Sequence, residues 1–235
     1  MSDHTHKQFD AEMEEIRSGV LAMGGLVETQ LTRAIDALKH PDNIDLIASV
    51  AADERAINQM QVSIDQQCSQ IIAKRQPTAI DLRMILTITK IVNDLERMAD
   101  EVKKVAYKAA ETHGSDRLTE VRYHDVMHAA EHALTMLQMA LDAFARLDVT
   151  AAAEVIDRDE EIDAAFHSIL RQLISYMMED PRTISHALEI VFIAKSIERI
   201  GDHAKNVAEA VVQVVRGKDV RHASAQEIRA EVADE

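Results

Sequence analysis

The chain has 235 residues, a formal net charge of −15, only 3% aromatic residues, no tryptophan and one cysteine. This acidic balance argues against nonspecific binding of nucleic acid or anionic lipid, which requires clustered Lys and Arg. The single Cys68 rules out an intrachain disulfide framework. No apolar run approaches the ~18 residues of a membrane span, so none is expected. The first residues, Ser2 to Lys7, lack the apolar stretch of a signal peptide, and we expect a cytoplasmic protein.

The composition predicts an all-α protein. Residues with good helix propensity dominate, whereas the chain contains only six glycines and three prolines. Breaks at turn residues such as Pro41, Pro77 and Pro181 separate six helices. These are expected near residues 8–39, 43–74, 79–112, 118–147, 150–179 and 183–216.

The most informative pattern is an internal duplication. Glu96-Arg97-Met98-Ala99-Asp100 recurs 102 residues later as Glu198-Arg199-Ile200-Gly201-Asp202. Each helix also has a stripe of apolar residues along one face, which we call its seam, and the seams of the first three helices recur in the last three. The gaps of three and four residues along a seam favour coiled-coil-like packing. Two tandem three-helix bundles follow. We expect a flexible N-terminal tail over 1–7, a first repeat over 8–114, a second repeat over 115–216 and a polar C-terminal tail over 217–235.

Acidic side chains interrupt the seams at matching places. Glu54 occupies a seam position of the second helix, Asp159 occupies the same position of the fifth, and Asn58 and Asp163 follow four residues later. A carboxylate on a seam is costly unless it lies near a helix end, is paired, or binds a metal ion. Oxygen donors without Cys favour Mg²⁺, Ca²⁺, Mn²⁺ or iron. The candidate metal ligands are Glu54, Asn58, Glu96, Asp100, Asp159, Asp163, Glu198 and Asp202.

Small residues on the seam have a structural explanation, because Ala99 and Gly201 let two helices approach closely. We favour the same explanation for Gly24 and Gly25 in the first helix, where a hinge is the alternative. The sequence contains no Glu-x-x-His pattern, no Gly-rich phosphate loop and no nucleophile elbow, so we predict neither catalytic nor cofactor-binding residues.

Together, these motifs resemble the PhoU family. The resemblance is carried by the duplicated Glu-Arg-x-(Ala/Gly)-Asp peptides, by Met23-Gly24-Gly25-Leu26-Val27 and by the segment from Arg75 to Arg83, and it covers about residues 8–216. It implies a non-enzymatic cytoplasmic adaptor that links the high-affinity phosphate ABC transporter ATPase to a sensor histidine kinase. Such an adaptor represses phosphate-starvation genes when phosphate is plentiful, forms a homodimer and reaches the membrane only through its partners.

The resemblance also implies metal ions, with iron, manganese, zinc and magnesium as candidates, on the paired acidic motifs. Asn58 departs from the family pattern because it replaces an acid, which leaves three carboxylates in the first repeat and four in the second. We therefore expect the second repeat to bind metal more tightly. Two other readings stay open: a carboxylate-bridged metal-binding protein or metal-dependent enzyme, and a helical scaffold whose acidic pairs are only surface charge.

Overall fold

The computed structural model describes residues 2–111, 119–218 and 220, which fold into six long α-helices and one short 3-10 helix. The all-α class is therefore confirmed. The elements are α1 (Ser2–Lys39), α2 (Ile44–Arg75), α3 (Ala79–Glu111), α4 (Thr119–Arg146), α5 (Val149–Glu179), η1 (Pro181–Thr183) and α6 (Ile184–Arg216).

The helix ends agree with the predicted ends to within one residue, with one exception. Helix α1 begins at Ser2, so the expected start of the first helix near residue 8 is wrong, and the flexibility of the tail over 1–7 stays a prediction. No Gly or Pro occurs in this stretch to stop the helix. The boundary expected near residue 114 lies outside the described residues, as does most of the C-terminal tail.

Local capping explains where several of the helices begin or end. The Asn43 side chain accepts a hydrogen bond from the Leu46 amide at 3.3 Å, and Asp148 accepts from Ala151 at 3.0 Å. At the other end of α2, Gln76 adopts a left-handed conformation and its amide donates to Ile72 O. Gly217 ends α6 in the same way, with a φ of 75°.

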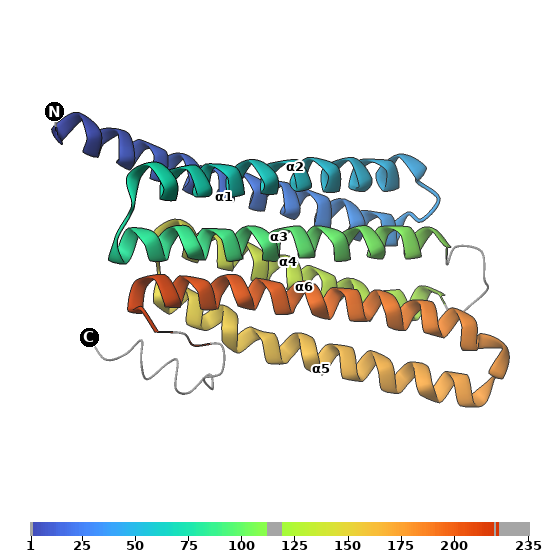
Figure 1. The fold of residues 1–235 in the computed structure, drawn as a ribbon. Helices are drawn as coiled ribbons and strands as arrows, with labels where there is room; N and C mark the ends of the chain where they lie inside the picture. The colour runs from blue at the N-terminus through green and yellow to red at the C-terminus, as the bar shows by residue number, and fades with distance from the viewer. Residues whose placement is uncertain (1, 112–118, 219, 221–235) are drawn as a thin grey trace.

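The helices form two three-helix bundles that pack against each other (Figure 1). Helices α1, α2 and α3 make one bundle and α4, α5 and α6 the other, while α3 contacts α6 and α1 contacts α4. The duplicated seam lies in the core as predicted. Its fully buried residues include Ile88, Leu95 and Val102 in the first repeat and Ile190, Ile197 and Ala204 in the second.

Two glycines allow close helix crossings. A Cβ atom at Gly201 would lie 2.7 Å from Ile162 Cδ1 of α5, and one at Gly24 would collide with the Leu141 side chain of α4. Gly25 differs, because no atom of the described residues lies within 4 Å of its Cβ position. The prediction of close packing is therefore confirmed for Gly24 and Gly201, and Gly25 faces open space.

Polar contacts join the two repeats where α3 runs antiparallel to α6. Arg199 of α6 pairs with the buried Glu101 of α3 at 2.7 Å. Asp94 of α3 contacts His203 Nδ1 at 2.8 Å and Asn206 Nδ2 at 3.1 Å. Because these contacts lie between repeats, they fix the position of one bundle relative to the other.

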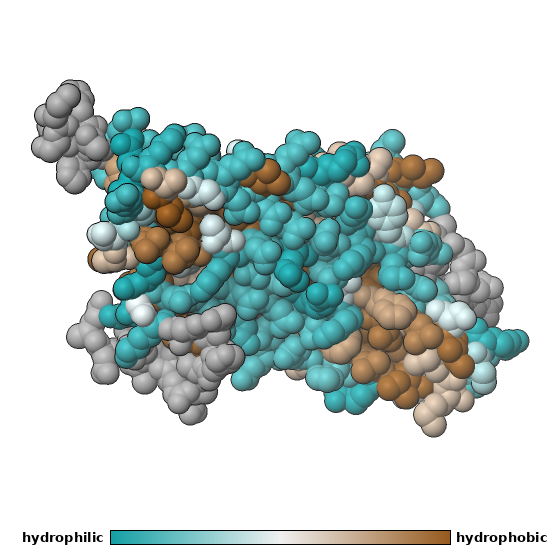
Figure 2. Space-filling model, viewed as in Figure 1, coloured by the Kyte–Doolittle hydropathy of each residue, from teal (hydrophilic) through white to brown (hydrophobic). Residues whose placement is uncertain are grey.

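The surface is hydrophilic over the middle of α3 and α6 and apolar near two ends (Figure 2). One apolar area covers the α5–α6 hairpin, where Ile174, Met178, Ile184, Leu188 and Phe192 are exposed. Among the described residues, no helix combines the length and the apolar character that a membrane span requires.

Candidate functional site

The first acidic cluster brings together residues of α2 and α3. The pKa of the half-buried Glu96 is raised by burial, then by the negative charges of Asp100 and, more weakly, of Glu54 across the helix boundary. Asn58 donates a hydrogen bond from Nδ2 to Glu54 Oε1 at 3.0 Å. The four positions predicted in the first repeat therefore share one site, which we call cluster 1.

The second cluster has the same construction between α5 and α6. Burial raises the pKa of Asp202 to about 6, and the charges of Glu198, Asp159 and Asp163 add to this increase. Burial therefore disfavours the ionised form of Asp202 most, and the neighbouring carboxylates disfavour it further. We call the four residues of this second repeat cluster 2.

The seam carboxylates are paired with lysines. Lys103 Nζ lies 3.3 Å from Glu54 Oε2, and Lys205 Nζ lies 2.6 Å from Asp159 Oδ2. Both carboxylates are buried. A seam carboxylate was expected to lie near a helix end, to be paired or to bind a metal ion, and the contacts show that both are paired. In cluster 2 a further lysine, Lys195, contacts Glu198 Oε1 at 2.5 Å.

Sequence reasoning missed these lysines, although a signal was present. Lys103 and Lys205 each follow the last acid of their motif by three residues, so the duplicated pattern extends to Glu-Arg-x-(Ala/Gly)-Asp-x-x-Lys. Their partners on α2 and α5 are distant in sequence, and only the packing of the helices reveals the pairs.

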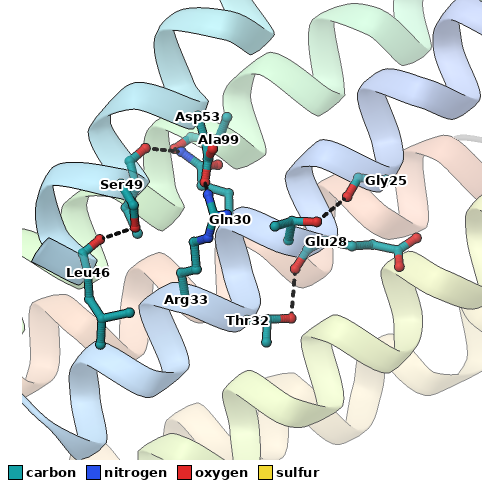
Figure 3. A network of polar contacts seen from close by, with 11 residues as sticks. Gly25, Glu28, Gln30, Thr32, Arg33, Leu46, Ser49, Asp53 and Ala99 are labelled. Atoms are coloured by element: carbon teal, nitrogen blue, oxygen red, sulfur yellow. Dashed lines mark hydrogen bonds and ion pairs between the residues drawn. The ribbon is translucent and has the colours of Figure 1, made fainter.

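A buried glutamine supports the backbone behind cluster 1 (Figure 3). Gln30 projects from α1 and its Nε2 donates to Val50 O of α2 at 3.1 Å and to Ala99 O of α3 at 3.3 Å. Ala99 belongs to the Glu96–Asp100 peptide, and Val50 precedes Glu54 by one turn. Gln30 is fully buried, and its two hydrogen bonds connect the two helices that carry the acids.

The donor atoms of both clusters suit a hard divalent cation, because they are carboxylate and amide oxygens. Two of these oxygens, Asn58 Oδ1 and Glu198 Oε2, are buried and accept no hydrogen bond from any residue that the structure describes. The side chains are nevertheless arranged around lysines. Within the described residues, no three or more His, Cys, Asp and Glu groups are placed to hold a metal ion. The donor chemistry fits a metal, and ligation by these eight residues stays a prediction.

A polar groove gives cluster 2 access to solvent. It lies along α6 and is lined by Arg199, Asp202, His203, Lys205, Asn206 and Glu209. Since Asp202 and Lys205 belong to or contact cluster 2, an ion in solution can approach this cluster without opening the bundle.

Comparisons with known proteins agree with the duplicated architecture. The PhoU domain matches the chain twice, at residues 20–109 and 126–211. The phosphate-specific transport system accessory protein PhoU homolog of Pseudomonas putida is 46% identical over 235 residues, covering 99% of this chain and 90% of that protein. The crystal structure of PhoU from Pseudomonas aeruginosa has a TM-score of 0.83 and 46% identity, and covers 89% of this chain and 100% of that one.

A more distant solved structure has the same fold. The phosphate transport system regulatory protein PhoU from Streptococcus pneumoniae is 27% identical, with a TM-score of 0.82 over 90% of this chain and 99% of that one. The agreement therefore covers both repeats in sequence and in fold, and it shows that this chain belongs to the PhoU family.

Proposed function

We propose that this chain is a non-catalytic cytoplasmic adaptor between the high-affinity phosphate ABC transporter ATPase and a sensor histidine kinase. In this role it represses the phosphate-starvation genes when phosphate is plentiful. The observation that carries the proposal is the match of both repeats to relatives named as accessory and regulatory proteins of phosphate transport. The chain has the accessory role in phosphate transport that these relatives have in common.

The surface supports a role in protein contacts. Exposed apolar side chains are grouped on the α5–α6 hairpin, and Ile184, Leu188 and Phe192 follow one another at intervals of four along α6. Grouped apolar side chains on a surface are typical of protein interaction sites. The middle of α3 and α6 beside the hairpin is hydrophilic (Figure 2), so this apolar area ends there.

The adaptor role is tested in a gene-deletion strain carrying a phosphate-starvation promoter reporter, grown with abundant phosphate. We expect high reporter activity in the deletion strain and silencing by the wild-type gene. A reporter that stays silent in the deletion strain would exclude repression by this protein.

The contact surface is tested in the same strain with Phe192→Asp and Leu188→Asp. Each places a charge on an already exposed position, so the thermal unfolding temperature should stay within a few degrees of wild type while the reporter becomes active. Ile44→Asp is the control, because Ile44 is an exposed apolar residue at the start of α2, outside the α5–α6 hairpin. Full silencing by Phe192→Asp and Leu188→Asp would show that the hairpin contacts neither partner.

Metal binding is a second candidate function. It is favoured by the equivalent positions of clusters 1 and 2 in the two repeats and by the unpaired buried oxygens of Asn58 and Glu198. A bound ion would add positive charge between α2 and α3 and between α5 and α6, and would stabilise each bundle. Candidate ions are iron, manganese, zinc and magnesium, since all accept oxygen ligands.

This second candidate is tested by equilibrium dialysis of the chelator-treated protein against Mn²⁺. We expect binding that is weakened in Glu96→Gln and Glu198→Gln. A metal-dependent enzyme would in addition turn over a substrate when loaded. Equal binding by wild type and a protein carrying both substitutions would exclude these sites.

We also propose that the chain is a homodimer, as the family resemblance implies. Light scattering after size-exclusion chromatography measures this directly, with twice the mass of the 26.2 kDa chain expected.

A further inference from the structure

The same ion pair occurs in both repeats. Lys103 and Lys205 occupy equivalent positions of α3 and α6, and their carboxylate partners Glu54 and Asp159 occupy equivalent positions of α2 and α5. Although the acid changes from Glu to Asp, the ammonium group remains on the seam carboxylate. The lysine–carboxylate pair is therefore a feature that both repeats share.

The two members of each pair differ in their exposure. The carboxylate side chains are only 9% exposed at Glu54 and 7% at Asp159, whereas the lysine side chains are 37% exposed at Lys103 and 34% at Lys205. A carboxylate at such a depth needs a positive partner. The lysine approaches it from the solvent side on a flexible stem and can leave without disturbing the core.

A second difference between the clusters concerns their charge. Cluster 2 has one carboxylate more than cluster 1, because Asp163 stands where cluster 1 has Asn58. It also has one lysine more, because Lys195 stands where the first repeat has Asn93. Each cluster thus has two carboxylates more than contacting lysines. The lysine count follows the carboxylate count, as expected if lysines neutralise the clusters.

A metal ion bound by the seam carboxylates would compete for the oxygens that the lysines contact. Glu54 and Asp159 are the most buried acids that α2 and α5 supply, and a divalent cation binds oxygen at roughly 2.0–2.6 Å. An ammonium group 2.6 Å from Asp159 Oδ2 occupies this space and repels the cation. The two cations are therefore alternatives at one position.

We propose that Lys103 and Lys205 are built-in counter-cations that neutralise the clusters in the metal-free chain and move out to solvent when a divalent cation binds. They set the metal affinity by competing for Glu54 and Asp159. This inference rests on the proposed metal binding. It adds a function for residues of the chain that are not themselves ligands.

The first test measures Mn²⁺ affinity, with free Mn²⁺ followed by electron paramagnetic resonance. Lys103→Met and Lys205→Met keep the aliphatic stem and remove the charge, and each should tighten Mn²⁺ binding at its cluster on the order of tenfold. Lys104→Met is the matched control. Lys104 follows Lys103 on α3, and it pairs at 2.9 Å with Glu101, an acid outside cluster 1. Its loss should leave the affinity unchanged.

The second test uses the wild-type chain, so it does not depend on the folding of a variant. Lysines are acetylated briefly with and without Mn²⁺, and each site is quantified by mass spectrometry. Lys103 and Lys205 should react several-fold faster when Mn²⁺ is bound. Lys90, which contacts Gln213 on the α3–α6 boundary, should not change.

The outcomes separate the two proposals. No Mn²⁺ binding by wild type or by the lysine variants would overturn both metal binding and the lysine exchange. Equal affinity in all proteins, or unchanged acetylation of Lys103 and Lys205 on binding, would leave metal binding in place and overturn the exchange. Tighter binding by the variants together with faster acetylation supports the exchange.

Discussion

In the first repeat a buried glutamine, Gln30, connects α1 to the backbone of α2 and α3, whereas the second repeat has the apolar Met136 at the equivalent position. Both side chains are fully buried and the helices pack in the same way. A duplicated backbone therefore tolerates either a hydrogen-bonded amide or a thioether of similar volume. The shared arrangement depends on the seams more than on this polar contact.

The acidic clusters differ in a coordinated manner. Cluster 1 has Asn58 on α2, and Asn93 lies three residues before Glu96 on α3; the second repeat has Asp163 and Lys195 at these two positions. Two neutral side chains thus correspond to a negative and a positive one. This difference opposes the expectation that the second repeat binds metal more tightly, because Lys195 offsets the charge that Asp163 adds.

The largest effect on stability is expected from a substitution where the two repeats contact each other through α1 and α4. Helix α1 has Gly24 at this crossing, whereas α4 has Ala130 at the equivalent position. Gly24→Leu should destabilise the chain by about 3 kcal/mol, because the new side chain overlaps Leu141. Gly25→Leu is the control and should be neutral or slightly stabilising, since this position is open and Leu is the better helix former. Urea unfolding measures the stability of both variants. Similar destabilisation by Gly24→Leu and Gly25→Leu would mean that the loss does not come from the crossing with Leu141.

The next effect concerns Gln30. Gln30→Ala should cost about 2 kcal/mol, because it leaves a cavity and removes two buried hydrogen bonds. Gln30→Met copies the second repeat and should stay within about 1 kcal/mol of wild type, since it fills the space and removes the unpaired Oε1. Chemical unfolding compares the two variants. If Gln30→Met is as damaging as Gln30→Ala, the hydrogen bonds matter more than the volume.

A smaller effect tests the charge balance of the clusters. Lys195→Met should strengthen Mn²⁺ binding at cluster 2 about tenfold, and Asn93→Lys should weaken it at cluster 1 by a similar factor. The first variant removes the lysine from the second repeat, and the other introduces a lysine at the equivalent position of the first repeat. Mn²⁺ titration, with Glu96→Ala and Glu198→Ala to assign each site, checks this. An unchanged affinity in both variants would show that these positions do not influence binding.

The smallest effect is a pH dependence from Asp202. Its pKa in the folded chain, about 6, lies above its ordinary value, so the protonated form is favoured in the fold. The stability contribution of Asp202 is therefore complete below about pH 4 and is lost as the pH rises through 6. For a half-buried group that solvent screens, the loss is about 1 kcal/mol. Asp202→Asn should exceed wild type in stability at pH 7 by this amount and match it near pH 4, as measured by thermal unfolding with chelator present. A constant difference across this range would contradict the assignment.

The amino-acid sequence by itself determined the helices and the duplication. Helix ends depend on local signals such as Asn43, Asp148 and Gly217, and the seams repeat at a fixed spacing, so both are legible along the chain. The start of α1 was the exception, because no residue near position 8 begins a helix more strongly than its predecessors. The sequence also placed Glu54 and Asp159 on the seams, where each was expected to lie near a helix end, to be paired or to bind a metal ion.

Only the tertiary structure decided what those partners are. Lys103 and Glu54 lie on different helices, as do Lys205 and Asp159, and the contact depends on how α3 packs on α2 and α6 on α5. The same is true of Gln30, whose acceptors belong to two other helices, and of Arg199, which pairs with Glu101 across the repeats. Periodicity fixes which face of a helix is buried, but the depth and register of neighbouring helices determine which charges meet.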